Sequence, residues 1–171
     1  ELIQPPALSF MRAARDRLWW YKAVKNLEGE VVWSKLGKII RVFPTNPISS
    51  MIILAGYYYD VLNYAVRLAA LLDTLSSVSR MFVPSDKSKK KKQIYPPIWS
   101  KCKHKTGDHL TLLKLFLTFE MHHETERDWC QKNEINFLLM KEVKKLEHQL
   151  LRTIESGPGW DMKEWVIPEL K

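Results

Sequence analysis

Basic side chains recur at helical spacing near the C-terminal end of the chain, and they are the residues best placed to do chemistry. Successive intervals of four, three and four residues separate Lys141, Lys145, His148 and Arg152. This spacing places them on one face of a helix, where cations can hold a phosphate backbone without reading its sequence. An ordinary solvated helix face explains the pattern equally well, and Glu142 and Glu147 on the same helix weaken the local field.

A second basic feature is a run of lysines in the middle of the chain, with no acidic residue among them. It consists of Lys87, Lys89, Lys90, Lys91, Lys92, Lys101, Lys103 and Lys105. These eight lysines equal the whole formal net charge of +8. Such a run indicates a polyanionic partner, either nucleic acid or an anionic membrane. A solvated loop that binds nothing explains the run about equally well. From both features we predict that the nucleic-acid-binding residues are Lys87, Lys89, Lys90, Lys91, Lys92, Lys141, Lys145 and Arg152.

Motifs that support catalysis or tight metal binding are not found in the sequence. There is no Gly-x-x-x-x-Gly-Lys-Ser/Thr loop, no Gly-x-Ser-x-Gly and no His-Glu-x-x-His, so we predict no catalytic residue and no ATP bound by this chain alone. Cysteine and histidine are zinc-ligand types, and the candidate ligands of this chain are Cys102, His104, His109 and Cys130. Their spacing does not match the usual zinc patterns, and we predict no metal.

Length and composition limit the remaining possibilities. The chain has 171 residues, of which 46% are hydrophobic, enough for one domain or two small subdomains with a shared core. Because it begins at Glu1, we expect a piece of a longer protein. Two cysteines give no disulfide framework, which favours an intracellular compartment. The most apolar window, 51–75, is interrupted by charges and reads as a buried helix pair, not a membrane span.

The first part of the chain, 1–47, has the outline of a degenerate winged helix. Met11, Ala14, Leu18 and Tyr21 mark one apolar helical face. For the Trp19–Trp20 pair, packing in the core or between domains is favoured over base stacking. A short strand is predicted at 31–33, and Ser34 is predicted to cap a helix over 35–42. A two-helix hairpin with a loop would look similar.

The second part, 48–155, is predicted to be a helical bundle, followed by a tail at 156–171 that docks through its tryptophans. Asn46 or Ser49 should cap a first helix and Asp60 a second. Residues 85–105 read as a lysine-rich loop. Beyond it, 107–154 reads as a helical hairpin capped by Asp108, with one apolar face carrying Leu110, Leu113 and Leu117 and another carrying Ile135, Leu139, Val143, Leu146, Leu150 and Ile154. The expected fold class is therefore mainly α.

Several short motifs occur in a particular order between Pro5 and Ile154. In sequence they are Pro5-Pro6, Phe43-Pro44-Thr45-Asn46-Pro47, Leu68-Ala69-Ala70-Leu71-Leu72, Phe82-Val83-Pro84, Gly107-Asp108-His109-Leu110-Thr111-Leu112-Leu113, Trp129-Cys130 and Gln149-Leu150. In this order they resemble the C-terminal accessory region of DEAH-box RNA helicases, a winged helix followed by a helical-bundle ("ratchet", HA2-type) domain. Departures from the family pattern indicate a divergent member. Tyr21-Lys22-Ala23-Val24 replaces the usual Leu-Gly-Ala-Leu, Asn133-Glu134-Ile135 replaces Asn-Phe, and the arginines common on the family's last helix are mostly Lys or Glu here.

The resemblance implies an accessory domain that guides RNA and couples a helicase motor to remodelling of ribonucleoproteins, in splicing, ribosome assembly or small-RNA pathways. ATP and Mg would belong to RecA-like lobes elsewhere in the parent protein, with no cofactor in this chain. The implied partners are RNA, those lobes, an OB-fold and a G-patch-type cofactor or ribonucleoprotein proteins, with no membrane, in the nucleus or nucleolus. The alternative is a non-catalytic helicase-related scaffold that uses 87–105 as an RNA-binding arm.

Overall fold

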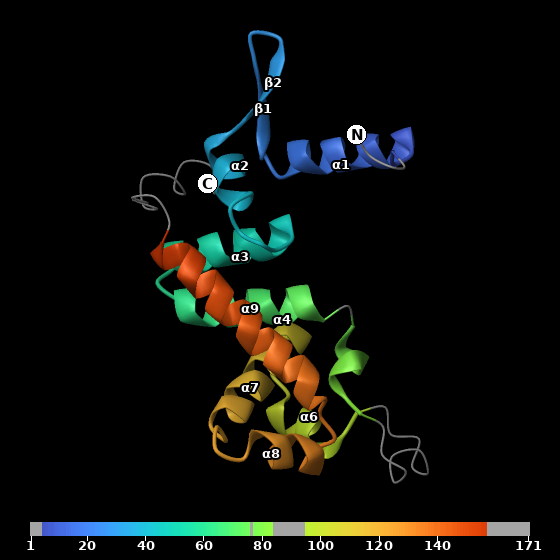
Figure 1. Cartoon of the computed structure of the whole chain (residues 1–171), viewed down its shortest axis with the longest axis vertical. Coiled ribbons are helices and arrows are strands. Elements are labelled where there is room, and N and C mark those ends of the chain that lie inside the picture. The colour runs from blue at the N-terminus through green and yellow to red at the C-terminus, as the bar shows by residue number, and fades with distance from the viewer. Residues whose placement is uncertain (1–4, 76, 84–94, 157–171) are drawn as a thin grey trace.

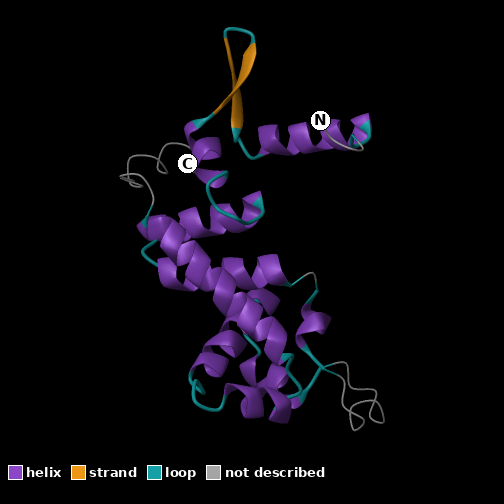
Figure 2. Cartoon of the chain, viewed as in Figure 1, coloured by secondary structure: helices purple, strands orange, loops and turns teal. Residues whose placement is uncertain are grey.

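The computed structural model describes residues 5–75, 77–83 and 95–156. That part of the chain is mainly helical, with one antiparallel hairpin, which confirms the predicted fold class (Figure 2). In chain order the elements are α1 (Leu8–Trp20), β1 (Val24–Leu27), β2 (Glu30–Trp33), α2 (Lys35–Ile40), α3 (Pro47–Tyr58), α4 (Leu62–Thr74), η1 (Val78–Met81), α6 (Pro97–Cys102), α7 (Asp108–Glu120), α8 (Glu126–Lys132) and α9 (Phe137–Glu155).

The N-terminal unit, 5–46, consists of a helix, a β-hairpin and a short helix. β1 pairs with β2 in a register that places Val24 opposite Trp33 and Leu27 opposite Glu30. The connecting residues Glu28 and Gly29 have φ values of +52° and +91°, as hairpins with two-residue loops require. The sequence predicts only the second strand. β1 was missed because its central residues, Lys25 and Asn26, are polar and it exists through pairing with β2.

The junction between the hairpin and α2 is tightly fixed. Ser34 Oγ accepts a hydrogen bond from the Gly37 amide at 2.9 Å and donates one to the Lys22 carbonyl at 2.7 Å. This confirms Ser34 as the N-cap of α2. An added Cβ at Gly37 would lie 1.9 Å from the Ala23 carbonyl oxygen. Gly37 of α2 therefore packs against the backbone of Ala23, the residue just before β1, at a distance that only glycine allows.

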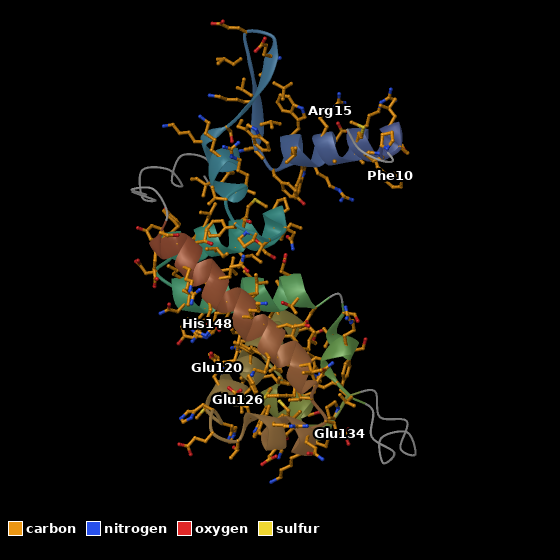
Figure 3. The ribbon with its side chains drawn as sticks, viewed as in Figure 1. Phe10, Arg15, Glu120, Glu126, Glu134 and His148 are labelled. Carbon is orange, nitrogen blue, oxygen red and sulfur yellow. The ribbon has the colours of Figure 1, made fainter. Side chains whose placement is uncertain are left out.

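Helix α1 extends sideways from the hairpin and has no buried residue (Figure 1). Phe10, at its outer end (Figure 3), is 74% exposed and Trp20 is 80% exposed. The predicted apolar face, from Met11 to Tyr21, therefore reaches no core among the described residues. Trp19 and Trp20 likewise do not pack in the core of the described part of the chain, and their packing between domains stays a prediction.

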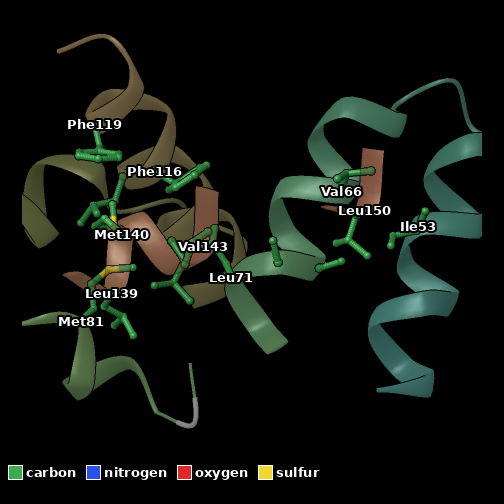
Figure 4. Packing of buried hydrophobic residues seen from close by; sticks show 14 of the residues in the cluster. Ile53, Val66, Leu71, Met81, Phe116, Phe119, Leu139, Met140, Val143 and Leu150 are labelled. Atoms are coloured by element: carbon green, nitrogen blue, oxygen red, sulfur yellow. The ribbon is translucent and has the colours of Figure 1, made fainter. Parts of the chain in front are cut away.

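The second unit is a bundle in which α9 crosses α3 and α4. Gly56 on α3 approaches α4 so closely that an added Cβ would lie 2.1 Å from the Ala65 Cβ. Leu150 of α9 lies between Ile53 and Val66 in this region (Figure 4). Further along α9, Met140 and Val143 pack with aromatic residues of α7. One apolar core thus joins helices from both halves of the bundle.

Two predicted caps at α3 and α4 have different outcomes. Asn46 does cap α3, because its Oδ1 accepts a hydrogen bond from the Ser49 amide at 2.9 Å. Asp60 does not cap α4. It has a φ of +57° and ends the turn after α3, and Val61 occupies the N-cap position without a side-chain hydrogen bond. Asp73 adds a link that the sequence did not indicate, since its Oδ1 accepts from the Asn46 amide at 2.9 Å.

The predicted helical hairpin over 107–154 is instead three helices, α7, α8 and α9. Gly107 precedes α7, and Asp108 is its first residue without acting as a side-chain cap. The predicted α7 face was displaced, since Leu110 is 37% exposed and Leu117 is half-buried. The buried side of α7 carries Thr111, Leu112, Leu113, Leu115, Phe116 and Phe119. The predicted apolar face of α9 is confirmed from Leu139 onward: Leu139, Val143 and Leu150 are buried, and Leu146 and Ile154 pack against the core. Ile135 is also buried but lies before the helix, in an isolated bridge with Phe82.

The range 85–105, expected to be a loop, contains the short helix α6. Ile98, Trp99 and Cys102 of this helix are buried, which explains why a segment with little periodicity becomes ordered. Within the described residues, no helix is both long and apolar enough to cross a bilayer.

Candidate nucleic-acid interface

One face of α9 presents the predicted basic residues together. Lys141, Lys145, His148 and Arg152, hereafter the α9 stripe, are all exposed. The helix is 19 residues long and is capped by Asn136, whose side chain accepts from the Leu139 amide at 3.2 Å. With a rise of about 1.5 Å per residue, the stripe extends for about 16 Å. The predicted residues Lys87, Lys89, Lys90, Lys91 and Lys92 lie outside the described residues.

Glu147, which the sequence suggested would weaken the stripe, points away from it. Its side chain is turned to the bundle and the residue is 5% exposed. Oε1 of Glu147 lies 3.3 Å from Nε of Arg67, which also donates to Oε2 of Glu120 at 2.9 Å. Arg67 thus joins α4, α7 and α9. Glu142 remains exposed on α9, so only one of the two expected acidic neighbours stays near the stripe.

Burial raises the pKa of Glu147. Desolvation is the largest cause, Arg67 opposes it, and the nearby Glu120 carboxylate adds to it. The direction follows because a carboxylate loses water in this position while two acids share one guanidinium. Because Glu147 is buried and paired with Arg67, it contributes little negative charge to the face occupied by the α9 stripe.

Lys144, next to the α9 stripe in sequence, does not belong to it. Its ammonium group binds Glu126 of α8 and lies 5.4 Å from the centre of the Phe119 ring. Figure 3 shows Glu120, Glu126 and His148 along the same side of the bundle. Pairing with the protein holds Lys144 in place. The α9 stripe consists of the lysine, histidine and arginine side chains of α9 that remain turned toward solvent.

The cysteines do not form the zinc site considered from the sequence. Cys102 and Cys130 are both buried and not disulfide-bonded. Burial, with a contribution from Glu126, raises the pKa of Cys130 to about 12, whereas a zinc ligand must be a thiolate. His104 instead lies 2.6 Å, through Nδ1, from the Thr106 hydroxyl. Among the described residues, no three His, Cys, Asp or Glu side chains gather closely enough to hold a metal.

Sequence reasoning missed the positive charge of the N-terminal unit. Residues 5–46 contain eight lysines and arginines but three acidic residues, and all eight cations are exposed. The whole-chain count concealed this excess because acidic residues elsewhere cancel it. Counting charge separately over each predicted unit would have revealed it.

Comparison with known proteins gives a consistent set of relatives. No protein-family model matches the chain. The chain is 25% identical over 154 residues to the human protein named ATP-dependent RNA helicase homolog DQX1, and 25% identical to the Mus musculus protein of the same name. It is 24% identical over 157 residues to the Schizosaccharomyces pombe pre-mRNA-splicing factor ATP-dependent RNA helicase prp22.

The similarity extends over almost all of this chain but over a small part of each relative. It covers 90% of this chain and 20% of the human and mouse proteins, and 91% of this chain and 12% of the Schizosaccharomyces pombe protein. The chain therefore spans a fifth or less of the length of these relatives. It is related in sequence to a region of RNA helicases.

Proposed function

We propose that this chain is the winged-helix and ratchet (HA2-type) region of a DEAH-type RNA helicase and that its α9 stripe guides RNA. The observation that carries the proposal is the exposed stripe of Lys141, Lys145, His148 and Arg152, with Glu147 withdrawn from it by Arg67. Two further observations support it: the similarity to RNA helicases over nine-tenths of the chain, and the order of a helix–hairpin–helix unit followed by a bundle.

The α9 stripe suits a role in holding a moving strand. Its cations contact phosphates, which are the same at every nucleotide, so a strand keeps its attraction as it advances. The stripe lies on one long helix that packs against α4 and is tied to α4 and α8 by ion pairs, and the Arg67 of α4 that binds it also pairs with α7. Because this support is rigid, a displacement caused by the neighbouring motor is transmitted to the bound RNA and is not absorbed by bending of the helix.

In this proposal the motor lies elsewhere in the parent protein. RecA-like lobes hold ATP and Mg there, and an OB-fold and a G-patch-type cofactor or ribonucleoprotein proteins are further partners. A nuclear location is proposed because the Schizosaccharomyces pombe relative is named a pre-mRNA-splicing factor. This chain supplies no catalytic residue and no ligand to the nucleotide.

The test compares two charge variants of the full-length protein. One replaces Lys141, Lys145 and Arg152 by glutamine, and the matched control replaces Lys114, Arg127 and Lys132, which are exposed on α7 and α8. RNA affinity is measured against salt by fluorescence anisotropy. Each lost phosphate contact lowers the log–log salt slope by about 0.7 for a single strand, so the stripe variant should lose about 2 and the control should keep its slope. Equal slopes in both variants would refute a guiding role for the stripe.

A second candidate function is a non-catalytic, helicase-related scaffold that binds RNA through its lysine run. It is favoured by the concentration of Lys87, Lys89, Lys90, Lys91 and Lys92 within a few residues. It requires that the full-length protein show no RNA-stimulated ATPase activity and that neutralising residues 89–92 weaken RNA binding in a salt-dependent way. RNA-dependent ATP turnover in the same sample would exclude it.

A further inference from the structure

The outer face of α2 and its C-cap residue together present three cations in a row. Lys35, Lys38 and Arg41 are exposed, whereas Leu36, Ile39 and Ile40 on the opposite side are buried. Successive cations are three residues apart, so the row extends for about 9 Å along the helix axis. The buried side fixes the rotation of α2, and the three cations therefore point to solvent together.

A tryptophan lies directly beside this row. Trp33 ends β2, and its ring packs over Gly37, since an added Cβ there would lie 2.9 Å from the ring. The guanidinium carbon of Arg41 lies 5.9 Å from the centre of the same ring, in a cation–π contact. Trp33 is nevertheless 40% exposed. Contacts with Gly37 and Arg41 thus fix the ring, and the exposed part of Trp33 faces solvent.

The hairpin extends this surface. Trp33 is opposite Val24 in the ladder and Val31 is opposite Asn26, so these side chains share one face of the hairpin. Val31 on that face is exposed. We call Val31, Trp33, Lys35, Lys38 and Arg41 the hairpin–α2 patch. It carries three positive charges and no acidic residue, within a unit whose residues 5–46 have eight basic and three acidic side chains.

We propose that the hairpin–α2 patch is a second RNA-contacting surface, at which Lys35, Lys38 and Arg41 hold phosphates and Trp33 stacks on a base. A positively charged row next to an open aromatic ring is the combination by which proteins bind single strands without sequence preference. It goes beyond the proposed function because the α9 stripe takes no part in it. Figure 1 shows the hairpin and α2 on the far side of α3 from α4, in the other unit of the chain.

Charge complementarity favours a polyanion over the other possible occupants. An apolar protein partner would meet three charged side chains around one half-covered ring, and those charges would lose water without a counter-charge. A nucleic acid provides a phosphate for each cation and a flat face for the ring. Phosphates and bases lie next to one another along a single strand. The cations and Trp33 lie next to one another in the patch in the same way.

The experiment uses the full-length protein and a fluorescent oligouridylate of about 12 nucleotides. The charge variant combines Lys35→Gln, Lys38→Gln and Arg41→Gln, and the stacking variant is Trp33→Leu. The matched control is Lys114→Gln, Arg127→Gln and Lys132→Gln. We expect the charge variant to lose about 2 from the log–log salt slope. The stacking variant should bind about tenfold more weakly at every salt concentration, with an unchanged slope, because a stacked base releases no counterion.

Further variants keep the test decisive if Trp33→Leu disturbs the hairpin. Trp33→Phe keeps an aromatic face and should retain most of the affinity, and the charge variant changes exposed residues alone. Circular dichroism of each variant checks its folding. Ultraviolet cross-linking to the same oligouridylate should also label the peptide that contains Trp33.

Each outcome is distinguishable from failure of the proposed function. If the α9 variant loses salt slope and neither patch variant changes, the second surface is refuted while the proposed function stands. If the patch variants lose binding and the α9 variant does not, the second surface stands and the α9 role fails. Displacement of the RNA by polyglutamate or by phosphatidylserine vesicles at equal charge concentration would overturn the assignment to RNA.

Discussion

Nε of Arg67 on α4 lies 3.3 Å from Oε1 of Glu147 on α9. The two residues are 80 positions apart in sequence, and the pair fixes the side of α9 that faces the bundle. Because Arg67 also binds Glu120 on α7, one guanidinium holds three helices in register. The orientation of the α9 stripe depends on this contact as well as on apolar packing.

Removing Arg67 should destabilise the bundle. In Arg67→Met, Glu120 and Glu147 would face each other without a cation, and breaking a buried pair from one side costs about 3 kcal/mol of unfolding free energy. Urea unfolding measures the loss. The control is Arg15→Met, which breaks the exposed pair with Asp16 on α1 and should change stability by less than about 1 kcal/mol. Equal losses in both variants would show that the Arg67 cluster stabilises nothing beyond an ordinary surface pair.

Glu147 should make stability depend on pH in a defined direction. Its pKa is raised in the folded protein, mainly by burial, so the folded state keeps the proton to a higher pH than the unfolded chain. The stabilising contribution of this carboxyl is complete below the unfolded pKa of about 4.3. It is lost as pH rises through the raised folded pKa.

The variant Glu147→Gln isolates this effect, since its amide is neutral at every pH. The unfolding free energy of the variant relative to the unmodified chain should therefore shift in favour of the variant as pH rises from about 4 to about 8. Unfolding in urea at several pH values gives the difference directly. A difference that stays constant, or one that moves the other way, would mean that burial does not control the ionisation of Glu147.

Gly37→Ala should disrupt the N-terminal unit. The added methyl group would lie 1.9 Å from the Ala23 carbonyl oxygen, and because that atom belongs to the backbone, α2 and the hairpin must separate. Overpacking of this kind costs about 3 kcal/mol. Gly29→Ala is the comparison, since nothing lies within 4 Å of an added Cβ there and the cost comes from its φ of +91°, about 1 kcal/mol. Amide hydrogen exchange of 22–41 should increase more in Gly37→Ala; the reverse order would contradict close packing at Gly37.

Local features of the fold were predictable because they depend on neighbouring residues. The caps at Ser34 and Asn46 are local, because each side chain accepts a hydrogen bond from the backbone amide three residues later. Asp60 was misassigned because an aspartate also tolerates the left-handed conformation that it adopts after α3. β1 could not be predicted from its own residues, since its strand geometry arises from pairing with β2.

Part of the candidate site was predictable in the same way, from local sequence patterns. Helical periodicity identified the α9 stripe, but it could not decide the direction of Glu147, which lies one position before His148 at the border between the apolar and basic faces. Its partner Arg67 comes from another helix, and no spacing rule connects them. The hairpin–α2 patch was missed because Trp33 and Arg41 meet through tertiary structure.

The chain enters and leaves the segment 84–94 at closely fixed points. The Val83 amide donates to the Glu134 carbonyl at 2.8 Å, and the rings of Phe82 and Tyr95 are 5.7 Å apart with Trp99 stacked on Tyr95. Val83 and Tyr95 are thus both held by contacts within the bundle itself. Substitutions at 84–94 should therefore leave Val83 and Tyr95 in place, because the contacts named here do not involve the residues between them.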